Sequence, residues 1–222
     1  MQIAGFKKQS LIDYPGNISS VVFTQGCNFR CEYCHNPDLV LPEKFGPIYN
    51  EDDLFSYWKK YKHLLDAVCI TGGEPCIHRD LPDFIRRIKN LNLKVKLDSN
   101  GTHPDQLRHL FENNLIDCIA MDIKHILEFE NYRQAVGYAL NKEGFNKILE
   151  SISLIESSGI HYEFRTTVVK GLHSIEQIKA LKNRFGKVYK IQNFNPEITL
   201  NPNPAFQAFS NAEILEMSHR ID

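Results

Sequence analysis

Short runs of apolar residues recur along the chain and alternate with longer stretches in which apolar positions repeat every three or four residues. Continuous apolar runs of this length are typical of strands in a parallel sheet whose two faces are both covered. The runs predict six strands, at residues 20–24, 67–71, 94–99, 118–124, 162–169 and 189–195.

The stretches between these runs have the spacing of amphipathic helices. One helical face is formed by Leu54, Phe55, Trp58, Tyr61 and Leu65, and another by Phe145, Ile148, Leu149, Ile152 and Ile155. Gly159 and Gly186 stand where a glycine commonly follows the last turn of a helix, and Ser174 with Gln177 has the spacing of a capping box. These signals predict that strands and helices alternate along the chain.

Six strand–helix units joined by right-handed crossovers predict an α/β fold, a partial (β/α)6 TIM-like barrel that is two units short of a complete one. An open, doubly wound sheet is also compatible with the periodicity. The 222 residues contain no convincing linker, so we expect a single domain over residues 1–222. It would comprise an N-terminal extension (1–18), a barrel core (about 19–196) and a C-terminal tail (197–222).

The charges are balanced and dispersed, since 26 basic and 27 acidic side chains give a formal net charge of -1. Without a basic tract, nucleic acid is not expected as a partner. No stretch approaches the length of an apolar membrane span, and the first ten residues lack the core of a signal peptide, so we expect a cytoplasmic protein without a membrane partner. The six cysteines are too sparse for a disulfide scaffold, and three of them fall within residues 27–34, as metal ligands do.

Polar, charged and glycine residues follow the predicted strands. They stand in the cysteine segment, in "TGGEP" (71–75), "LDSNGT" (97–102), "MDIK" (121–124) and "RTT" (165–167). Because chemistry in parallel α/β folds gathers at the C-terminal ends of the strands, these segments are expected to form one shared site.

Cys27, Cys31 and Cys34 form a C-x3-C-x2-C pattern. Structural zinc usually takes four protein ligands, whereas three thiolates on a [4Fe-4S] cluster leave one iron with an open coordination position. The triplet therefore favours a cluster that takes part in chemistry. His35 or Cys76 could complete a zinc tetrahedron, so a zinc site stays open as an alternative.

The cysteine pattern, with Tyr33 before its last cysteine and "GGEP" one strand–helix unit later, resembles the radical S-adenosylmethionine (radical SAM) superfamily. The resemblance implies a [4Fe-4S] cluster on the three cysteines and S-adenosylmethionine bound at its unique iron, where one electron cleaves the sulfonium. It also places Tyr33 near the adenine. Gly72, Gly73 and Glu74 would meet the methionine amino group, and bare glycine backbone suits a close approach to a ligand.

Residues 5–37, "GFKKQSLIDYPGNISSVVFTQGCNFRCEYCHNP", resemble the opening of the activating proteins of anaerobic ribonucleoside-triphosphate reductases, which belong to the glycyl-radical-enzyme activases. Later segments resemble the same group. The implied contacts with the methionine part of S-adenosylmethionine are Asp98, Ser99, Asp122 and Lys124. Arg165 would lie near its carboxylate or ribose, and Asn195 in "NFNPE" would be a polar ribose contact. Acidic groups suit an ammonium or another cation, while lysine and arginine suit a carboxylate.

Single members of this set also have structural interpretations. Asp98 could belong to a turn, Arg165 to a structural ion pair, and Lys124 to the surface at a strand end. The remaining cysteines are expected to be packed side chains rather than ligands: Cys69, Cys76 and Cys118.

The resemblance implies that the radical is placed on a backbone glycine of a partner enzyme, in the first instance an anaerobic ribonucleotide reductase, with flavodoxin or ferredoxin as the electron donor. The segment 125–138, polar and aromatic, could face that partner. Three alternatives stay open. They are an activase of the pyruvate formate-lyase type, a small-molecule enzyme resembling 7-carboxy-7-deazaguanine synthase, and a non-catalytic zinc or iron–sulfur module. A basic, closed substrate pocket would favour the small-molecule enzyme.

Overall fold

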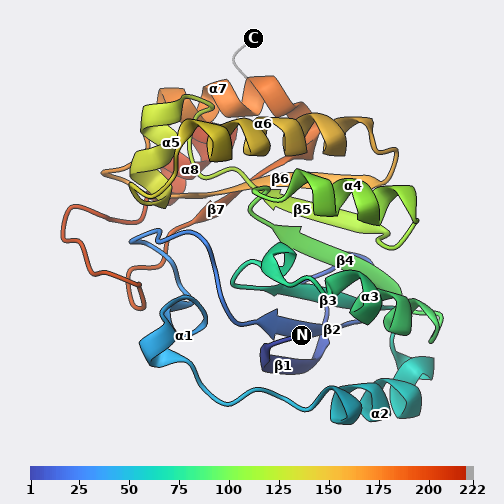
Figure 1. Cartoon of the computed structure of the whole chain (residues 1–222). Helices are drawn as coiled ribbons and strands as arrows, with labels where there is room; N and C mark the ends of the chain where they lie inside the picture. Colours follow the sequence, from blue (N-terminus) through green and yellow to red (C-terminus); the bar gives the residue numbers. More distant parts are fainter. Residues whose placement is uncertain (219–222) are drawn as a thin grey trace.

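The structure is a computed structural model that describes residues 1–218. Within this range one sheet holds seven strands in the order β1 to β7 (Figure 1). The strands from β2 to β7 are parallel, and β1 is antiparallel to β2. The strands are β1 (Ile3–Ser10), β2 (Ser19–Thr24), β3 (Ala67–Gly72), β4 (Lys94–Ser99), β5 (Cys118–Asp122), β6 (His161–Val168) and β7 (Tyr189–Asn193). Because β1 and β7 are its two edges, the sheet is open, as in a partial barrel.

The six parallel strands confirm the six predicted ones, with ends that differ by two residues at most. The sequence did not predict β1, because Lys7, Lys8 and Gln9 make its second half polar. A polar edge strand escapes a search for apolar runs, although such an edge also resists pairing with another chain. Gly5 allows β1 to lie close to β2, since a Cβ at this position would be 3.0 Å from the side chain of Phe23.

The helices succeed one another along the sheet in the order of the strands (Figure 1). They are α1 (Pro37–Val40), α2 (Glu51–Tyr61), α3 (Leu81–Lys89), α4 (Pro104–Glu112), α5 (Phe129–Val136), α6 (Lys142–Ser157), α7 (Ile175–Phe185) and α8 (Asn211–Ser218), with 3-10 turns η1 (Pro42–Lys44), η2 (Lys62–Leu64), η3 (Pro75–Ile77) and η4 (Gly186–Val188). The capping box of Ser174 and Gln177 is confirmed at the start of α7. Gly159 and Gly186 follow α6 and α7 with positive φ angles of 74° and 65°, as glycines beyond a helix end commonly do.

The predicted apolar faces pack into the core. In α2 the buried residues are Leu54, Phe55 and Trp58, and in α6 they include Phe145, Ile148, Ile152 and Ile155. Leu65 is also buried but follows η2, beyond the end of α2. Trp58 packs edge-on against Phe55 and Phe84, which confirms it as a core residue.

The sheet register decides which polar residues meet at the strand ends. Asp122 on β5 pairs with Arg165 on β6, and Asp98 on β4 pairs with Ala120, two residues before Asp122. Since alternate residues of a strand face the same side, Asp98, Asp122 and Arg165 project together. The arrowheads of the parallel strands point to the side on which the loop after β2 and the segment after β7 lie (Figure 1).

None of the helices formed by residues 1–218 has the length and apolar content that a bilayer crossing needs.

Candidate functional site

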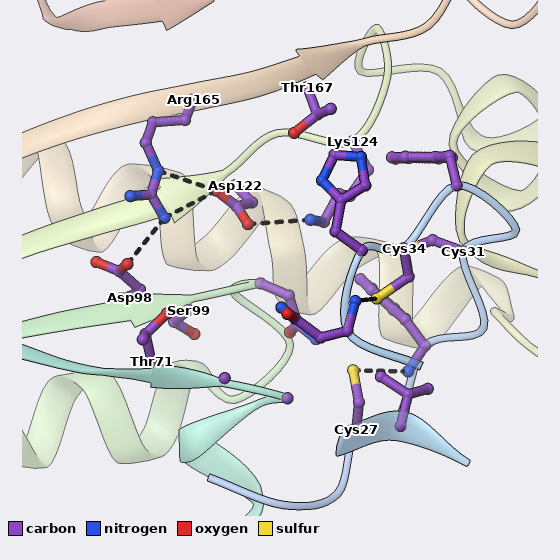
Figure 2. A pocket seen from close by; sticks show the side chains of 18 of the residues that line it. Cys27, Cys31, Cys34, Thr71, Asp98, Ser99, Asp122, Lys124, Arg165 and Thr167 are labelled. Carbon is purple, nitrogen blue, oxygen red and sulfur yellow. Dashed lines mark hydrogen bonds and ion pairs between the residues drawn. The ribbon is translucent and has the colours of Figure 1, made fainter. Parts of the chain in front are cut away.

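A pocket of about 230 Å³ lies at the C-terminal ends of the parallel strands. All but two of the predicted site residues line it, and Figure 2 shows the cysteines on one side of the pocket and the charged residues on the other. The predicted residues in its lining are Cys27, Cys31, Tyr33, Cys34, Gly72, Gly73, Asp98, Ser99, Asp122, Lys124 and Arg165. Glu74 and Asn195 are not among the lining residues. The strand ends therefore form one shared site.

Several lining residues were not predicted. They are Phe29, Asn36, Val40, Thr71, Asn100, Thr167 and Gln192. Thr71, Asn100 and Thr167 belong to segments that the sequence had already singled out, so a wider reading of each segment would have included them. Gln192 lies near the end of β7, whose sequence YKIQN is largely polar, so its position at a strand end was the available signal. His35, which the sequence suggested only as a possible fourth ligand of zinc, also lines the pocket.

The cysteine loop (residues 27–34) presents sulfur atoms that accept backbone hydrogen bonds. Phe29 N–H donates to Cys27 Sγ at 3.4 Å, and Asn36 N–H donates to Cys34 Sγ at 3.5 Å (Figure 2). Such N–H donors stabilise charge on thiolate ligands of iron–sulfur clusters. Burial raises the pKa of the Cys27 thiol to about 12 and that of the Cys31 thiol to about 11, so iron must displace protons when it binds.

This donor set fits a cluster held by three thiolates, because three sulfurs line one pocket and two of them accept amide hydrogen bonds. No three His, Cys, Asp or Glu side chains within residues 1–218 converge as the ligands of a single metal ion do.

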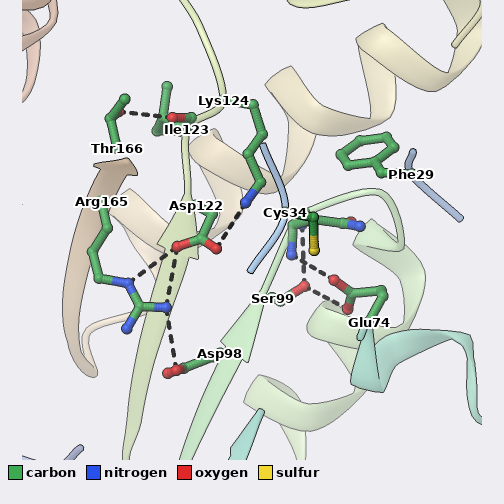
Figure 3. A network of polar contacts seen from close by, with 12 residues as sticks. Phe29, Cys34, Glu74, Asp98, Ser99, Asp122, Ile123, Lys124, Arg165 and Thr166 are labelled. Carbon is green, nitrogen blue, oxygen red and sulfur yellow. Dashed lines mark hydrogen bonds and ion pairs between the residues drawn. The ribbon is translucent and has the colours of Figure 1, made fainter. Parts of the chain in front are cut away.

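Opposite the cysteines, charged residues alternate in sign across three neighbouring strands (Figure 3). Arg165 Nη2 lies between the two carboxylates, 3.2 Å from Asp98 Oδ2 and 3.1 Å from Asp122 Oδ1. Lys124 Nζ contacts Asp122 Oδ2 at 3.0 Å, and Lys96 Nζ contacts Asp98 Oδ1 at 2.6 Å. Both carboxylates therefore form ion pairs with cations of the chain itself. Asp98 lies within β4, so it does not form the turn that its sequence context allowed.

The predicted site included neither Glu163 nor Lys96, although only 1% of Lys96 is exposed. Glu163 Oε1 lies 3.9 Å from both Lys96 and Arg165, so three cations face three carboxylates. Such a balance offsets part of the cost of burying charge. Burial opposes ionisation of Asp122, but Lys124 and Arg165 hold the pKa of its carboxyl down to about 2.

Glu74 lies beneath the pocket with its side chain fully buried. Its Oε1 accepts from Cys76 N–H and from the Ser99 hydroxyl, both at 2.9 Å, and its Oε2 accepts from Asn100 N–H at 2.6 Å. Burial raises the pKa of Glu74, and these three donors oppose that shift. The carboxylate thus joins the loops after β3 and β4, and Figure 3 shows it beside Ser99.

Gly72 and Gly73 are required by the packing of the chain itself. A Cβ at Gly73 would overlap the carbonyl of Gly26, and Gly72 has a φ of 115° and lies against the backbone of Thr24. Bare backbone at these positions therefore lets the loop after β3 pack directly against the loop after β2. The sequence suggested a different reason for the two glycines, the close approach of a ligand. These contacts do not test that reason, and it stays a prediction.

Asn195 is exposed and lies at the start of the segment that follows β7. Its side chain donates to Glu197 at 3.3 Å, and its backbone N–H donates to His35 Nε2 at 3.3 Å. The ring of His35 stacks on Phe194, with centroids 5.6 Å apart. Asn195 thus contacts His35, which lines the pocket, but does not line the pocket itself.

The segment 195–206 lies over the cysteine loop. Asn201 N–H donates to the Glu32 carbonyl at 3.0 Å, and the side-chain amides of Asn201 and Asn203 donate to the Glu32 carboxylate at 3.4 and 3.2 Å. Glu32 stands between Cys31 and Tyr33, so these hydrogen bonds cover the loop at the middle of the cysteine motif.

We expect Glu32→Ala to speed the loss of a reconstituted cluster in air several-fold, because the covering segment loses its carboxylate acceptor. The decay of iron–sulfur absorbance after exposure to oxygen measures this rate. The matched control is Glu43→Ala, an exposed glutamate of η1. Equal decay rates in wild type, Glu32→Ala and Glu43→Ala would contradict a protective role for the segment.

The other cysteines are buried, as expected. Cys76 is 1% exposed, is not part of the pocket lining, and accepts the Ser99 hydroxyl at its sulfur at 3.6 Å. Cys69 and Cys118 lie within β3 and β5. These positions agree with packed side chains.

Comparison with known proteins assigns this geometry to a family. Residues 21–185 match the radical SAM superfamily. The chain is 35% identical over 203 residues, 88% of its own length and 80% of the relative's, to the "Putative glycyl-radical enzyme activating enzyme" of Methanocaldococcus jannaschii. It is 27% identical over 197 residues, 86% of its length and 79% of the relative's, to the pyruvate formate-lyase-activating enzyme of Clostridium pasteurianum.

Among solved structures, Streptococcus suis SuiB bound to S-adenosylmethionine shares the fold, with a TM-score of 0.68 and 15% identity over 89% of this chain and 45% of SuiB. The chain belongs to the radical SAM superfamily. Membership implies a [4Fe-4S] cluster and S-adenosylmethionine as cofactors, and it makes the protein an enzyme rather than the non-catalytic metal-binding module that the sequence had left open.

Proposed function

We propose that this protein is a glycyl-radical-enzyme activase whose partner is an anaerobic ribonucleoside-triphosphate reductase. The observation that carries the proposal is a pocket in which three cysteines face the alternating charges of Asp98, Arg165, Asp122 and Lys124. The identity to the relative from Methanocaldococcus jannaschii supports an activase. Residues 5–37 comprise most of β1, all of β2 and the cysteine loop, and their resemblance to the activating proteins of anaerobic ribonucleoside-triphosphate reductases supports this particular partner.

In this proposal Cys27, Cys31 and Cys34 hold the cluster, which supplies one electron to the sulfonium of S-adenosylmethionine. The residues of the opposite wall bind and orient the methionine part of that molecule. Lys124 and Arg165 attract its carboxylate, while Asp98 and Asp122 attract its ammonium group. The buried, charge-balanced network holds these groups in place before the ligand arrives, which lowers the entropic cost of orienting it.

The remaining predicted contacts complete the ligand site. Tyr33 is 4% exposed and lines the pocket, where its ring would lie along the adenine. Ser99 and the backbone of Gly72 and Gly73 also line it. Asn195 would reach the ribose from the segment after β7. Glu74 acts in this scheme through the loops that it joins.

The glycine-bearing segment of the partner would enter at the open side of the sheet. We place the partner against residues 125–138, which include α5, because Tyr138 is 76% exposed there and Arg133 lies over its ring at 5.3 Å. Aromatic and arginine side chains are the residues on which protein interfaces most depend. An acidic electron carrier such as flavodoxin or ferredoxin would reduce the cluster. Six free cysteines suit the reducing cytoplasm, where we place the reaction.

A second candidate partner is a pyruvate formate-lyase, because the activating enzyme of Clostridium pasteurianum matches 86% of the chain. A metabolite as substrate is less well supported. The wall of the pocket pairs Lys124 and Arg165 with Asp122 and Asp98, whereas a metabolite-binding enzyme of the kind considered from the sequence calls for a basic pocket.

The test is radical transfer in the absence of oxygen. Reconstituted protein, S-adenosylmethionine, a reductant and an anaerobic ribonucleotide reductase should give one 5′-deoxyadenosine per glycyl radical, with the radical on the reductase. Electron paramagnetic resonance detects the radical, and exchange of the glycyl α-hydrogen in deuterated water should change its splitting. A pyruvate formate-lyase in place of the reductase tests the second candidate. Many turnovers without a protein radical would contradict both.

A further inference from the structure

Two buried histidines cross between the loops that follow β5 and β6, close to the charged wall of the pocket. His125 is 1% exposed and His173 is 6% exposed, and their rings stack with centroids 4.8 Å apart. Neither ring lines the pocket. Because the two histidines do not line the pocket, any role in the site must come from the groups to which their rings are hydrogen-bonded.

The hydrogen bonds of the two rings are reciprocal. His173 lies after β6, and its Nε2–H donates to the carbonyl of Lys124, after β5, at 3.0 Å. His125 lies after β5, and its Nε2–H donates to the carbonyl of Leu172, after β6, at 3.1 Å. Each ring therefore ties its own loop to the other one.

The second nitrogen of each ring fixes its protonation state. Nδ1 of His173 accepts from Val169 N–H at 3.0 Å, and Nδ1 of His125 accepts from Ile126 N–H at 2.9 Å. An Nδ1 that accepts carries no proton, so both rings are neutral. Burial lowers the pKa of His173 to about 4 and also lowers that of His125. The two reciprocal hydrogen bonds, which together form a clasp between the loops after β5 and β6, are thus intact at neutral pH.

The backbone of residues 122–124 is held on all sides. Tyr132 Oη accepts from Lys124 N–H at 3.1 Å and donates to the Asp122 carbonyl at 3.4 Å. Thr166 Oγ1 donates to the Ile123 carbonyl at 2.7 Å (Figure 3). With His173 on the carbonyl of Lys124, the main chain around Lys124 has little freedom, so its side chain starts from a fixed position from which Nζ reaches Asp122 at 3.0 Å.

We propose that His173 is a positioning residue for S-adenosylmethionine binding, which fixes Lys124 through its carbonyl, and that His125 closes the same clasp from the opposite loop. The inference rests on the proposed role of Lys124 as a ligand of S-adenosylmethionine. In physical terms, His173 in the loop after β6 determines where the side chain of Lys124, in the loop after β5, places its ammonium group. Loss of the Nε2–H donor frees the Lys124 carbonyl and lets the ammonium group leave its position.

The test is a double-mutant cycle of His173→Asn and Lys124→Ala, read as the dissociation constant of S-adenosylmethionine on cluster-loaded protein. An asparagine amide can still accept from Val169 N–H but is too short to reach the Lys124 carbonyl. We expect Lys124→Ala to weaken binding at least about tenfold, and His173→Asn, which removes one buried hydrogen bond, to weaken it up to about tenfold. The double variant should match Lys124→Ala to within about twofold, since His173 acts through Lys124.

Two further variants guard against a general loss of structure. His173→Gln, which keeps a side-chain donor near the Nε2 position, should recover most of the affinity. His109→Asn removes an exposed histidine of α4 and should bind as wild type does. Amide hydrogen exchange on cluster-free protein gives a readout independent of the cofactors, because residues 124–126 should exchange faster in His173→Asn than in His109→Asn.

The outcomes separate this inference from the proposed function. If Lys124→Ala binds S-adenosylmethionine normally, the proposed ligand site is wrong. If Lys124→Ala binds weakly but His173→Asn binds normally, only the positioning role fails. It also fails if His173→Asn weakens binding by the same factor with and without Lys124, because its effect would then be independent of the lysine.

Discussion

Replacing Cys27, Cys31 or Cys34 by alanine is expected to abolish cluster assembly, while wild-type protein reconstituted without oxygen takes up about four irons and four sulfides per chain. Each of these sulfurs lines the same pocket, and two of them accept amide hydrogen bonds. A cluster with two thiolates would have two unprotected irons and would lose them to solvent. Iron and sulfide analysis together with the visible absorption spectrum measures the effect.

Cys76→Ala is the matched control for these variants. Cys76 is as buried as a ligand would be, but it packs behind the pocket against Ser99. The variant should keep its full iron content and the open iron position that S-adenosylmethionine needs. Loss of the cluster in Cys76→Ala would mean that a fourth thiolate completes the site, and the argument from three ligands would be wrong.

The parallel strands could be predicted because burial leaves a direct mark on the sequence. Val68, Cys69 and Ile70 of β3 are fully buried and form a continuous apolar run. β1 left a weaker mark, because Ile3 and Phe6 pack against the core but Lys7 and Lys8 follow them directly and interrupt the apolar run. Its pairing with β2 depends on contacts between segments, which a search along one segment does not reveal.

The site could be predicted for a related reason. Strands that run in parallel bring their C-terminal ends together, so Asp98, Asp122 and Arg165 were expected to meet before any distance was known. Lys96 was missed because it lies two residues before Asp98, inside β4, where a lysine resembles an interruption of the strand. Only the structure shows that its ammonium group turns toward Asp98 and that Glu163 balances the added charge.

The direction of a side chain is the information that the sequence lacks at Glu74. The motif "GGEP" places this residue at the strand end, beside two glycines that line the pocket. The structure leaves Glu74 outside the pocket lining, and its carboxylate accepts three hydrogen bonds, from Cys76 N–H and from Ser99 and Asn100, which do line the pocket. A residue within a ligand-binding motif can thus act by holding two loops together.

Glu74→Ala is therefore expected to lower the free energy of unfolding by about 3–5 kcal/mol, because it leaves two buried amide donors without their acceptor and the Ser99 hydroxyl with the weak sulfur acceptor of Cys76. This loss is a large share of the stability of a typical domain. Glu74→Gln should cost less, since its amide oxygen still accepts. Urea unfolding of cluster-free protein, followed by circular dichroism, measures both, and Glu112→Ala on the exposed end of α4 is the control.

The same variants decide whether Glu74 contacts S-adenosylmethionine directly. If its role is to join the loops after β3 and β4, Glu74→Ala loses stability and ligand affinity together, and Glu74→Gln retains most of both. A direct contact predicts a different pattern, in which Glu74→Ala unfolds at the same urea concentration as Glu112→Ala but binds S-adenosylmethionine weakly. That pattern would overturn the structural role argued here and return Glu74 to the ligand site, where its sequence motif had placed it.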